Sequence, residues 1–358
     1  MADAAQRFNE PYETAFTRDF ASASAKLSAP AFTSALRKDG HATIDGFFGL
    51  PWASALLQEA RWLANRELLQ PNRTAFGRQV FSKPNIFESD LHDASVRTRV
   101  PELEALFAQE DVVGALRGAL PELSLTHGRD GKTVKLQWNR GGGGCFPMHY
   151  DNAGAPSKRR LTCLCYLNPD WAPGDGGELQ LQPFLGAAVT VRPLMDRMVV
   201  FYSERLLHRV TPCSKSRYCF TVWLDGEGCN RPQDLTLQLP ASALSDVRGT
   251  AALLRDSPAQ RVLSRAVYSE EYLLGLEQCL LGCDVTPQGV RELHEQMVAE
   301  HEARLAQLRA SPGVARIVDA LRKFRDDEAR AAAATEESKD NESADGAGAD
   351  AAAECETQ

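Results

Sequence analysis

The feature that most constrains the fold is a series of short β-prone runs between residues 133 and 224. Seven such runs, among them TVKLQW, LTCLCYLN and RYCFTVWL, are separated by turns such as GGGG and PGDGG. Short strands at this spacing predict a β-sandwich or barrel, because a parallel sheet would need a helix between successive strands. Metal-ligating side chains in this region would then line the mouth of a barrel.

The segments on either side of this β-rich block carry the periodicity of helices. Apolar residues recur at three- and four-residue spacing, which is typical of amphipathic helices. We expect a short strand at 41–44 and either long surface loops or a hairpin at 70–93. Helices are predicted at 30–39, 50–69, 100–120 and within 240–330.

The negative charge is concentrated at the C-terminal end. The net charge is −8, and residues 331–358 hold eight acidic residues and one lysine, which leaves the rest of the chain close to neutral. Such a segment without aromatic residues cannot bury enough apolar surface to fold, so we expect a disordered acidic tail. Residues 1–30 are polar and rich in Ala and Ser, and are expected to be loosely ordered apart from a short helix.

Composition also narrows the classes of partner and compartment. The longest apolar runs are too short to cross a bilayer, and the N-terminus lacks the basic start and apolar centre of a signal peptide. Nine cysteines without paired CxxC spacings fit reduced thiols, as in the cytoplasm or the nucleus. The short apolar runs lead us to expect no membrane partner, and the absence of a basic stripe from the β-rich block leads us to expect no nucleic acid.

The stretch FPMHYDNAG provides the first candidate site. In an extended strand, His149 and Asp151 lie on one face, and the other histidine of the β-rich block is His208. Two histidines and a carboxylate form a facial triad, which binds iron(II) and leaves positions open. Arg217, on the next predicted strand, could bind a carboxylate through two parallel hydrogen bonds. His-x-Asp alone is a weak signal, but together these residues predict an oxygenase that uses 2-oxoglutarate.

The same region resembles a known family. Residues 133–225 are similar to the prolyl 4-hydroxylase family of iron(II)/2-oxoglutarate oxygenases, and most of all to the cytosolic prolyl hydroxylases that act on hypoxia-inducible factor. The resemblance rests on HYDN, LTCLCYLNPDW, GGELQL, DRMVVFYSERLLHRVTP and RYCFTVWLDG. It implies a mainly β catalytic core, a double-stranded β-helix or jelly roll, with supporting N-terminal helices and a C-terminal helical extension.

The resemblance also implies domain boundaries and pocket residues. The dioxygenase domain would span 31–230, with its core at about 133–225, followed by a helical extension at 231–330. The three ligands above would hold the iron, and Arg217 would pair with the distal carboxylate of 2-oxoglutarate, assisted by the hydroxyls of Tyr166 and Thr221. The apolar positions that would wall the co-substrate pocket are Leu164, Leu179, Val210 and Trp223.

Two positions depart from the family pattern or leave its register open. A tyrosine that relatives place ten residues before the first iron ligand is replaced by Asn139, with Trp138 beside it. Either Arg159 or Arg160 matches a basic position near the peptide-binding edge.

The resemblance implies hydroxylation of a prolyl residue of a protein or peptide at C4, with succinate and CO2 as co-products. The cofactors would be Fe(II), 2-oxoglutarate, O2 and L-ascorbate, and residues 72–87 would close over the peptide. A lysyl or small-molecule substrate is an alternative, as is a non-catalytic scaffold built on the C-terminal helices. The sequence indicates no oligomeric state.

Overall fold

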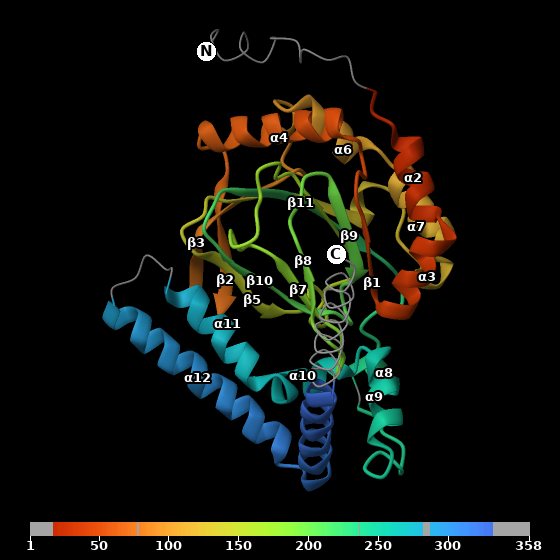
Figure 1. Ribbon diagram of the computed structural model, residues 1–358, viewed down its shortest axis with the longest axis vertical. Coiled ribbons are helices and arrows are strands. Elements are labelled where there is room, and N and C mark those ends of the chain that lie inside the picture. Colours follow the sequence, from red (N-terminus) through yellow and green to blue (C-terminus); the bar gives the residue numbers. More distant parts are fainter. Residues whose placement is uncertain (1–16, 77–78, 236, 282–286, 332–358) are drawn as a thin grey trace, which may run out of the picture.

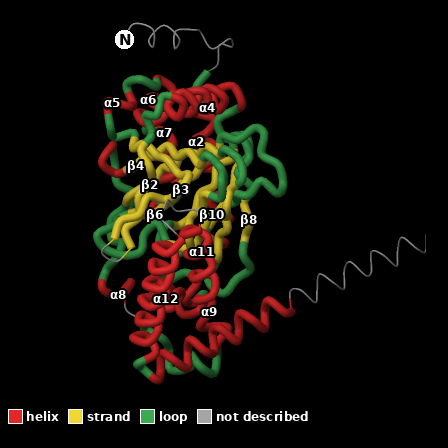
Figure 2. The backbone as a smooth tube through the Cα atoms, turned by 90° about the vertical axis from the view of Figure 1, so that its left-hand side faces the viewer, coloured by secondary structure: helices red, strands yellow, loops and turns green. Residues whose placement is uncertain are grey.

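Two antiparallel β-sheets lie at the centre of the molecule, and helices cover both of its ends (Figures 1 and 2). The computed structural model describes residues 17–76, 79–235, 237–281 and 287–331. The strands, in chain order, are β1 (His41–Ile44), β2 (Gln70–Phe76), β3 (Gln79–Asp90), β4 (Lys132–Asn139), β5 (Gly144–His149), β6 (Arg159–Tyr166), β7 (Leu179–Gln182), β8 (Val189–Val191), β9 (Arg197–Tyr202), β10 (Leu207–Cys213) and β11 (Arg217–Asp225).

The order of the strands creates a large and a small sheet. The large sheet has the order β1-β9-β6-β11-β4-β3-β2, and the small sheet has the order β5-β10-β7-β8. Side chains from both sheets line one cavity, so the sheets face each other as in a jelly roll. The predicted mainly β core with flanking helices is therefore confirmed.

The helices fall into an N-terminal and a C-terminal group. The first group covers the large sheet, and the second lies against the small sheet at the opposite end (Figure 1). The helices are α2 (Phe20–Ser28), α3 (Pro30–Asp39), α4 (Leu50–Asn65), α5 (Ala94–Arg97), α6 (Pro101–Ala108), α7 (Asp111–Ala119), α8 (Pro232–Leu235), α9 (Val247–Arg255), α10 (Gln260–Val267), α11 (Ser269–Leu281) and α12 (Pro287–Arg309), and residues 312–331 are also helical.

Helix α4 forms for the reason its periodicity indicated. Its apolar residues Trp52, Leu56 and Leu63 are buried in the core that the N-terminal helices share with the large sheet. The carboxylate of Glu59 accepts hydrogen bonds of 2.8 Å from the backbone amides of Glu102 and Leu103, which begin α6. This carboxylate satisfies amides that have no partner within α6, and it fixes α6 against α4.

The C-terminal helices pack against the strand that precedes Asp151. Helix α11 crosses β5 so closely that a Cβ atom on Gly275 would lie 3.3 Å from the amide nitrogen of Met148. One turn further along α11, the Sγ atom of Cys279 lies 3.1 Å from that of Cys145 on β5. Tyr150, buried beneath α10, makes a hydrogen bond with Ser264. The small sheet thus uses the C-terminal helices as its outer cover.

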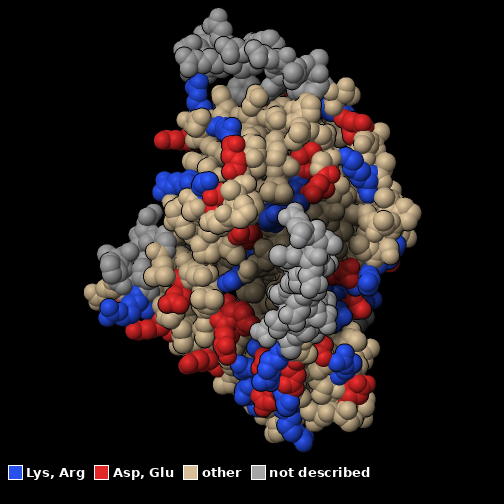
Figure 3. Space-filling view, viewed as in Figure 1, with Lys and Arg blue, Asp and Glu red and all other residues tan. Residues whose placement is uncertain are grey.

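The outer face of the C-terminal helices carries charges of both signs. Figure 3 shows acidic and basic side chains interspersed at this end of the molecule. Arg309 pairs with Asp319 at 2.9 Å, and Arg325 pairs with Glu271 at 3.2 Å. None of the helices among the described residues is both long and apolar enough to span a membrane.

The structure corrects the prediction of one helix over residues 100–120. The chain forms α6 and α7 instead, because Gln109 adopts an extended conformation between them. Its side-chain oxygen accepts a hydrogen bond of 3.0 Å from the amide of Val112, which begins α7. Lys132 donates to the carbonyl oxygen of Gln109 at 2.6 Å and holds this turn in place.

The structure also describes the region at 70–93 and part of the N-terminal segment, for which loops or a hairpin and a short helix were expected. Residues 70–93 form the hairpin alternative, β2 and β3, which extends the large sheet through β4. The expected short helix of the N-terminus is α2, with Ala23 and Leu27 buried. This part of residues 1–30 therefore belongs to the helical layer and is not loosely ordered. Residues 1–16 and the acidic tail beyond residue 331 lie outside the described residues.

Candidate metal centre and the cavity around it

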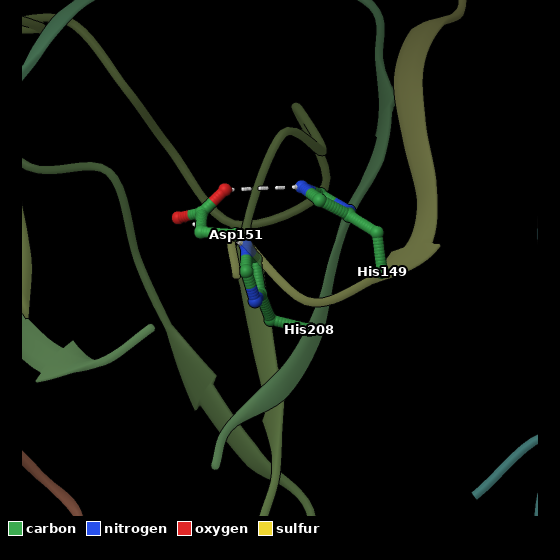
Figure 4. A group of neighbouring side chains, drawn as sticks. All are labelled: His149, Asp151 and His208. Carbon is green, nitrogen blue, oxygen red and sulfur yellow. Dashed lines mark ion pairs between the residues drawn. The ribbon is translucent and has the colours of Figure 1, made fainter. Parts of the chain in front are cut away.

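Three potential metal ligands meet where two strands of the small sheet pair. His149 at the end of β5 lies opposite His208 on β10, and Asp151 follows β5 by two residues. One ligand atom from each of the three lies within 4.8 Å of the others, and both histidine Nε2 atoms lie 3.6 Å from a carboxylate oxygen of Asp151 (Figure 4). This cluster is the one group of its kind within the described ranges.

Backbone carbonyl groups fix the orientation of both imidazole rings. The Nδ1 atom of His149 lies 2.8 Å from the carbonyl oxygen of Pro147, and that of His208 lies 3.0 Å from the carbonyl oxygen of Leu206. Because Nδ1 donates to these carbonyl groups in the neutral ring, Nε2 carries the lone pair and faces the other ligands. The arrangement is typical of histidines that bind a metal.

The protonation states also suit a divalent cation. Burial would raise the pKa of Asp151, but the two histidines and a 2.7 Å hydrogen bond from the Thr162 hydroxyl outweigh burial and hold it well below the usual range. Burial and the neighbouring His149 lower the pKa of His208 to about 4. At neutral pH the carboxylate is therefore ionised and His208 is neutral, as metal binding requires.

A cavity of about 190 Å³ opens beside the three ligands. Arg217 and Thr221 reach the cavity from β11 of the large sheet. The four apolar residues predicted to wall it also line it, from strands of both sheets. Tyr166 is not among the lining residues, and its ring lies beneath Arg217, 4.9 Å from the guanidinium carbon. A Cβ atom on Gly177 would approach the Arg217 side chain to 2.8 Å, so glycine at this position lets the loop before β7 close over the arginine.

The guanidinium group of Arg217 is only partly paired. Its Nη1 atom donates to the Sγ atom of Cys219 at 3.4 Å, whereas its Nε and Nη2 atoms are buried without a hydrogen bond to any described residue. The indole nitrogen of Trp223, six residues further along β11, is also buried without a partner among these residues. An unpaired guanidinium group away from water is strongly unfavourable, and buried charges in native proteins are normally paired. The cavity is therefore built to receive an anion, and a carboxylate matches the planar guanidinium group. These residues fit a metal ion with a carboxylate co-substrate beside it.

The structure distinguishes between the two candidate arginines on β6. Arg159 lines the cavity and lies over the ring of Trp223, with its guanidinium carbon 4.1 Å from the ring centroid. Arg160 forms a salt bridge of 2.9 Å with Glu204. Asn139, which replaces the family tyrosine, is buried and closes the turn before β5 by donating to the carbonyl oxygen of Gly144 at 2.8 Å. It does not line the cavity.

Sequence reasoning missed the polar wall that β3 and β4 contribute. Lys83, Glu88, Lys135 and Gln137 line the cavity, as does Asn72. In the structure, Gln137 pairs with Cys219 and Lys135 with Thr221 on β11. The alternation of side chains along β4 places these two residues on one face, which is the signal that the sequence contains. Their partners face the same side of the sheet as Arg217, but the pairing of β4 with β11 could not be read from the sequence.

Comparison with known proteins places this arrangement in a family. The profile of the 2OG-Fe(II) oxygenase superfamily matches residues 136–225. Egl nine homolog 1 of Homo sapiens is 26% identical over 208 residues, which cover 55% of this chain and 46% of that protein. The chain spans less than half the length of the curated relatives that it matches.

Two solved structures are similar over most of their own length. A prolyl 4-hydroxylase of Phytophthora capsici superposes with a TM-score of 0.76 at 42% identity, covering 89% of this chain and 99% of the other. A prolyl hydroxylase of Trichoplax adhaerens, solved with a peptide fragment of hypoxia-inducible factor, has a TM-score of 0.50 at 24% identity, covering 60% and 95%. The second likeness shows the fold, and the first extends from fold to sequence over nearly the whole relative. The chain therefore belongs to the prolyl 4-hydroxylase family of 2OG-Fe(II) oxygenases.

Proposed function

We propose that this protein is an iron(II)- and 2-oxoglutarate-dependent dioxygenase that hydroxylates a prolyl residue of a protein at C4, with succinate and CO2 as co-products. One observation carries the proposal: the cavity that holds the ligand cluster also holds the buried guanidinium group of Arg217, whose Nε and Nη2 atoms have no hydrogen-bond partner among the described residues. The prolyl hydroxylases among its relatives support the substrate class.

The roles of the residues follow from their positions. His149, Asp151 and His208 would hold iron(II), which activates oxygen when bound and leaves positions open for the co-substrate. Arg217 would hold the distal carboxylate of 2-oxoglutarate. Thr221 lies four residues further along β11 and lines the same cavity, so its hydroxyl can contribute a second contact.

The remaining pocket residues would shape the co-substrate site and exclude water from it. Tyr166 does not line the cavity in the structure, and it would support the guanidinium group of Arg217 from beneath. The apolar walls lower the local dielectric constant, which strengthens the pairing of a carboxylate with Arg217. The proposed wall residues are Leu164, Leu179, Val210 and Trp223.

The mouth of the cavity would receive the peptide. The hairpin of β2 and β3 contributes Asn72, Lys83 and Glu88 to the lining, and β6 contributes Arg159. We expect the hairpin to contact the peptide, with L-ascorbate acting as a reductant that keeps the iron ferrous. A cytoplasmic or nuclear location stays a prediction.

The first test is succinate formation by the purified full chain with iron(II), ascorbate and 2-oxoglutarate, without and with prolyl peptides. We expect turnover in the wild type and background levels in His208→Ala and Arg217→Ala. Arg248→Ala is the matched control, because Arg248 pairs with Glu328 on the surface of the C-terminal helices, and it should retain wild-type activity.

Binding measurements distinguish an oxygenase from a non-catalytic scaffold. Loss of activity in His208→Ala should accompany loss of iron affinity, whereas Arg217→Ala should lose affinity for 2-oxoglutarate but not for the metal. A wild type that binds neither ligand would contradict the proposal and favour a scaffold role. Product analysis by mass spectrometry then distinguishes a prolyl from a lysyl or small-molecule substrate.

A further inference from the structure

The charged groups of the cavity do not balance. The lining residues include four cationic side chains and two carboxylates besides the histidines. The four cations are Lys83, Lys135, Arg159 and Arg217, and the carboxylates are Glu88 and Asp151. A divalent metal ion and the dianion of 2-oxoglutarate would add charges that cancel each other. Two positive charges would therefore remain in the loaded cavity.

Both carboxylates already have partners. Glu88 accepts a hydrogen bond from Lys135 at 2.8 Å through one oxygen and one from Asn72 through the other. Asp151 lies between the two histidines and accepts from Thr162 at 2.7 Å. Because these carboxylates have partners, the excess positive charge of the lining belongs to Lys83 and Arg159. Asp225, outside the lining, lies opposite Arg159 on β11 and attracts it, which leaves Lys83 as the cation with the greater need for a carboxylate.

Aromatic rings hold these two cations in place. The Nζ atom of Lys83 lies 4.0 Å from the centroid of the Phe146 ring on β5, and Arg159 lies over Trp223. Neither forms a salt bridge with a carboxylate among the described residues. Burial lowers the pKa of Lys83 to about 8 and outweighs the attraction of Glu88 and Asp151, so the ammonium group destabilises the folded chain. Such a group gains stability when a ligand brings a carboxylate.

Lys83 and Arg159 reach the cavity from two different strands of the large sheet. In the large sheet, β3 with Lys83 is three strands away from β6 with Arg159. A prolyl peptide lying across the mouth can therefore bring one acidic side chain to each cation.

We infer that Lys83 selects peptides that carry an acidic residue near the target proline, and that Arg159 receives a second carboxylate on the other side. Lys83 is thus a specificity-determining residue for a peptide of acidic character. This inference rests on the proposed function, because it assumes that a prolyl peptide occupies the mouth of the cavity.

The test compares two labelled peptides that differ only in charge. Both carry one proline in an Ala/Gly background, flanked on each side by glutamate in one peptide and by glutamine in the other. Fluorescence anisotropy measures their affinity for the full chain loaded with 2-oxoglutarate and zinc in place of iron. We expect the glutamate peptide to bind about tenfold more tightly, and the preference to weaken as salt is added.

Variants assign the preference to Lys83. Lys83→Met should bring the affinity for the glutamate peptide close to that for the glutamine peptide, and Lys83→Arg should retain the preference. Lys38→Met, on the exposed end of α3, is the matched control and should behave as the wild type. Equal affinity of the wild type for both peptides, or an equal loss for both in Lys83→Met, would overturn the inference, as would no binding of either.

Succinate formation without peptide separates this inference from the proposed function. If the wild type forms succinate but does not distinguish the peptides, the oxygenase stands and the role of Lys83 falls. If succinate does not form and neither peptide binds, both fall. Lys38→Met, which lies outside the cavity, should leave succinate formation without peptide unchanged.

Discussion

Arg217 is the residue at which burial and charge conflict most clearly. It is 3% exposed, and two of its nitrogen atoms have no hydrogen-bond partner in the described part of the chain. The free energy that this arrangement costs in the empty protein is recovered when an anion binds. Affinity and stability should therefore be linked at this one side chain.

We predict that 2-oxoglutarate stabilises the wild type through Arg217. With zinc in the metal site and 2-oxoglutarate at a hundred times its dissociation constant, the free energy of unfolding should rise by about 2.7 kcal/mol. In Arg217→Met the same ligand concentration should add much less. Urea unfolding followed by circular dichroism measures both values. Equal stabilisation of the two proteins would show that the co-substrate binds elsewhere.

The charge of Lys83 should lower the free energy of unfolding of the ligand-free protein. Its pKa of about 8 lies below its ordinary value of 10.5, so the unfolded chain binds more protons between these values. The loss of folding stability caused by the charged Lys83 is complete below pH 8 and disappears as the pH rises toward 10.5. We expect Lys83→Met to raise the free energy of unfolding by about 1 kcal/mol at pH 7. Urea titrations at pH 7 and pH 10 should show this gain shrinking, with Lys38→Met unchanged at both.

At the scale of elements, β5 connects three parts of the molecule. It pairs with β10 through the two histidines, carries Phe146 toward Lys83 and contacts α11 on its other side. The thiols of Cys145 and Cys279 meet where α11 crosses it. The hydrogen bond with Cys279 lowers the pKa of Cys145, as do the positive charges of Lys83 and Arg209.

We predict that a small-molecule disulfide such as oxidised glutathione links Cys145 to Cys279. One thiolate attacks the reagent, breaks its S–S bond and forms a mixed disulfide while one glutathione leaves. The second thiol then attacks the mixed disulfide and displaces the other glutathione, so two glutathione thiols are released for each protein disulfide. Peptide mapping by mass spectrometry should find the linked pair, absent from Cys279→Ser and retained in Cys229→Ser. Glutathione adducts without a linked peptide would contradict the proximity of the two thiols.

The sequence was informative where chemistry and local pattern coincide. The cluster of His149, Asp151 and His208 was predictable because few combinations of residues suit iron, and the structure brings the three together. The elements β1 and α4 follow from local sequence pattern. The wall formed by β3 and β4 could not, because it depends on strand pairing between segments far apart in the chain. The break between α6 and α7 at Gln109 could not be predicted, because the helical spacing of apolar residues continues through it.

At the scale of the whole molecule, the C-terminal helices share a core with the small sheet. Met148, Tyr150 and Leu207 are buried in one cluster with Leu263 and Val267 of α10. The predicted domain boundary at residue 230 remains a prediction, but the segment beyond it covers apolar surface of the sheet that bears the metal ligands. Removal of this cover would expose several large side chains to water.

We therefore predict that a chain ending at residue 230 loses its native structure, whereas a chain ending at residue 331 keeps it. Near-ultraviolet circular dichroism and thermal unfolding would compare the two with the full chain. The chain that ends at residue 331 lacks only residues outside the described ranges, so it serves as the control for removal of the C-terminal end. A melting transition of the short chain at the temperature of the full chain would show that the β-core is independent.

The pairing of His149 with His208 across neighbouring strands has a consequence for the lifetime of the protein. A metal ion held by both would tie together two points separated by 59 positions in the chain, and would act much as a covalent cross-link does. Molecules without the ion would open more often and be degraded sooner. Pulse-chase labelling should therefore find a shorter half-life in cells deprived of iron, which would make the abundance of the protein a record of metal supply.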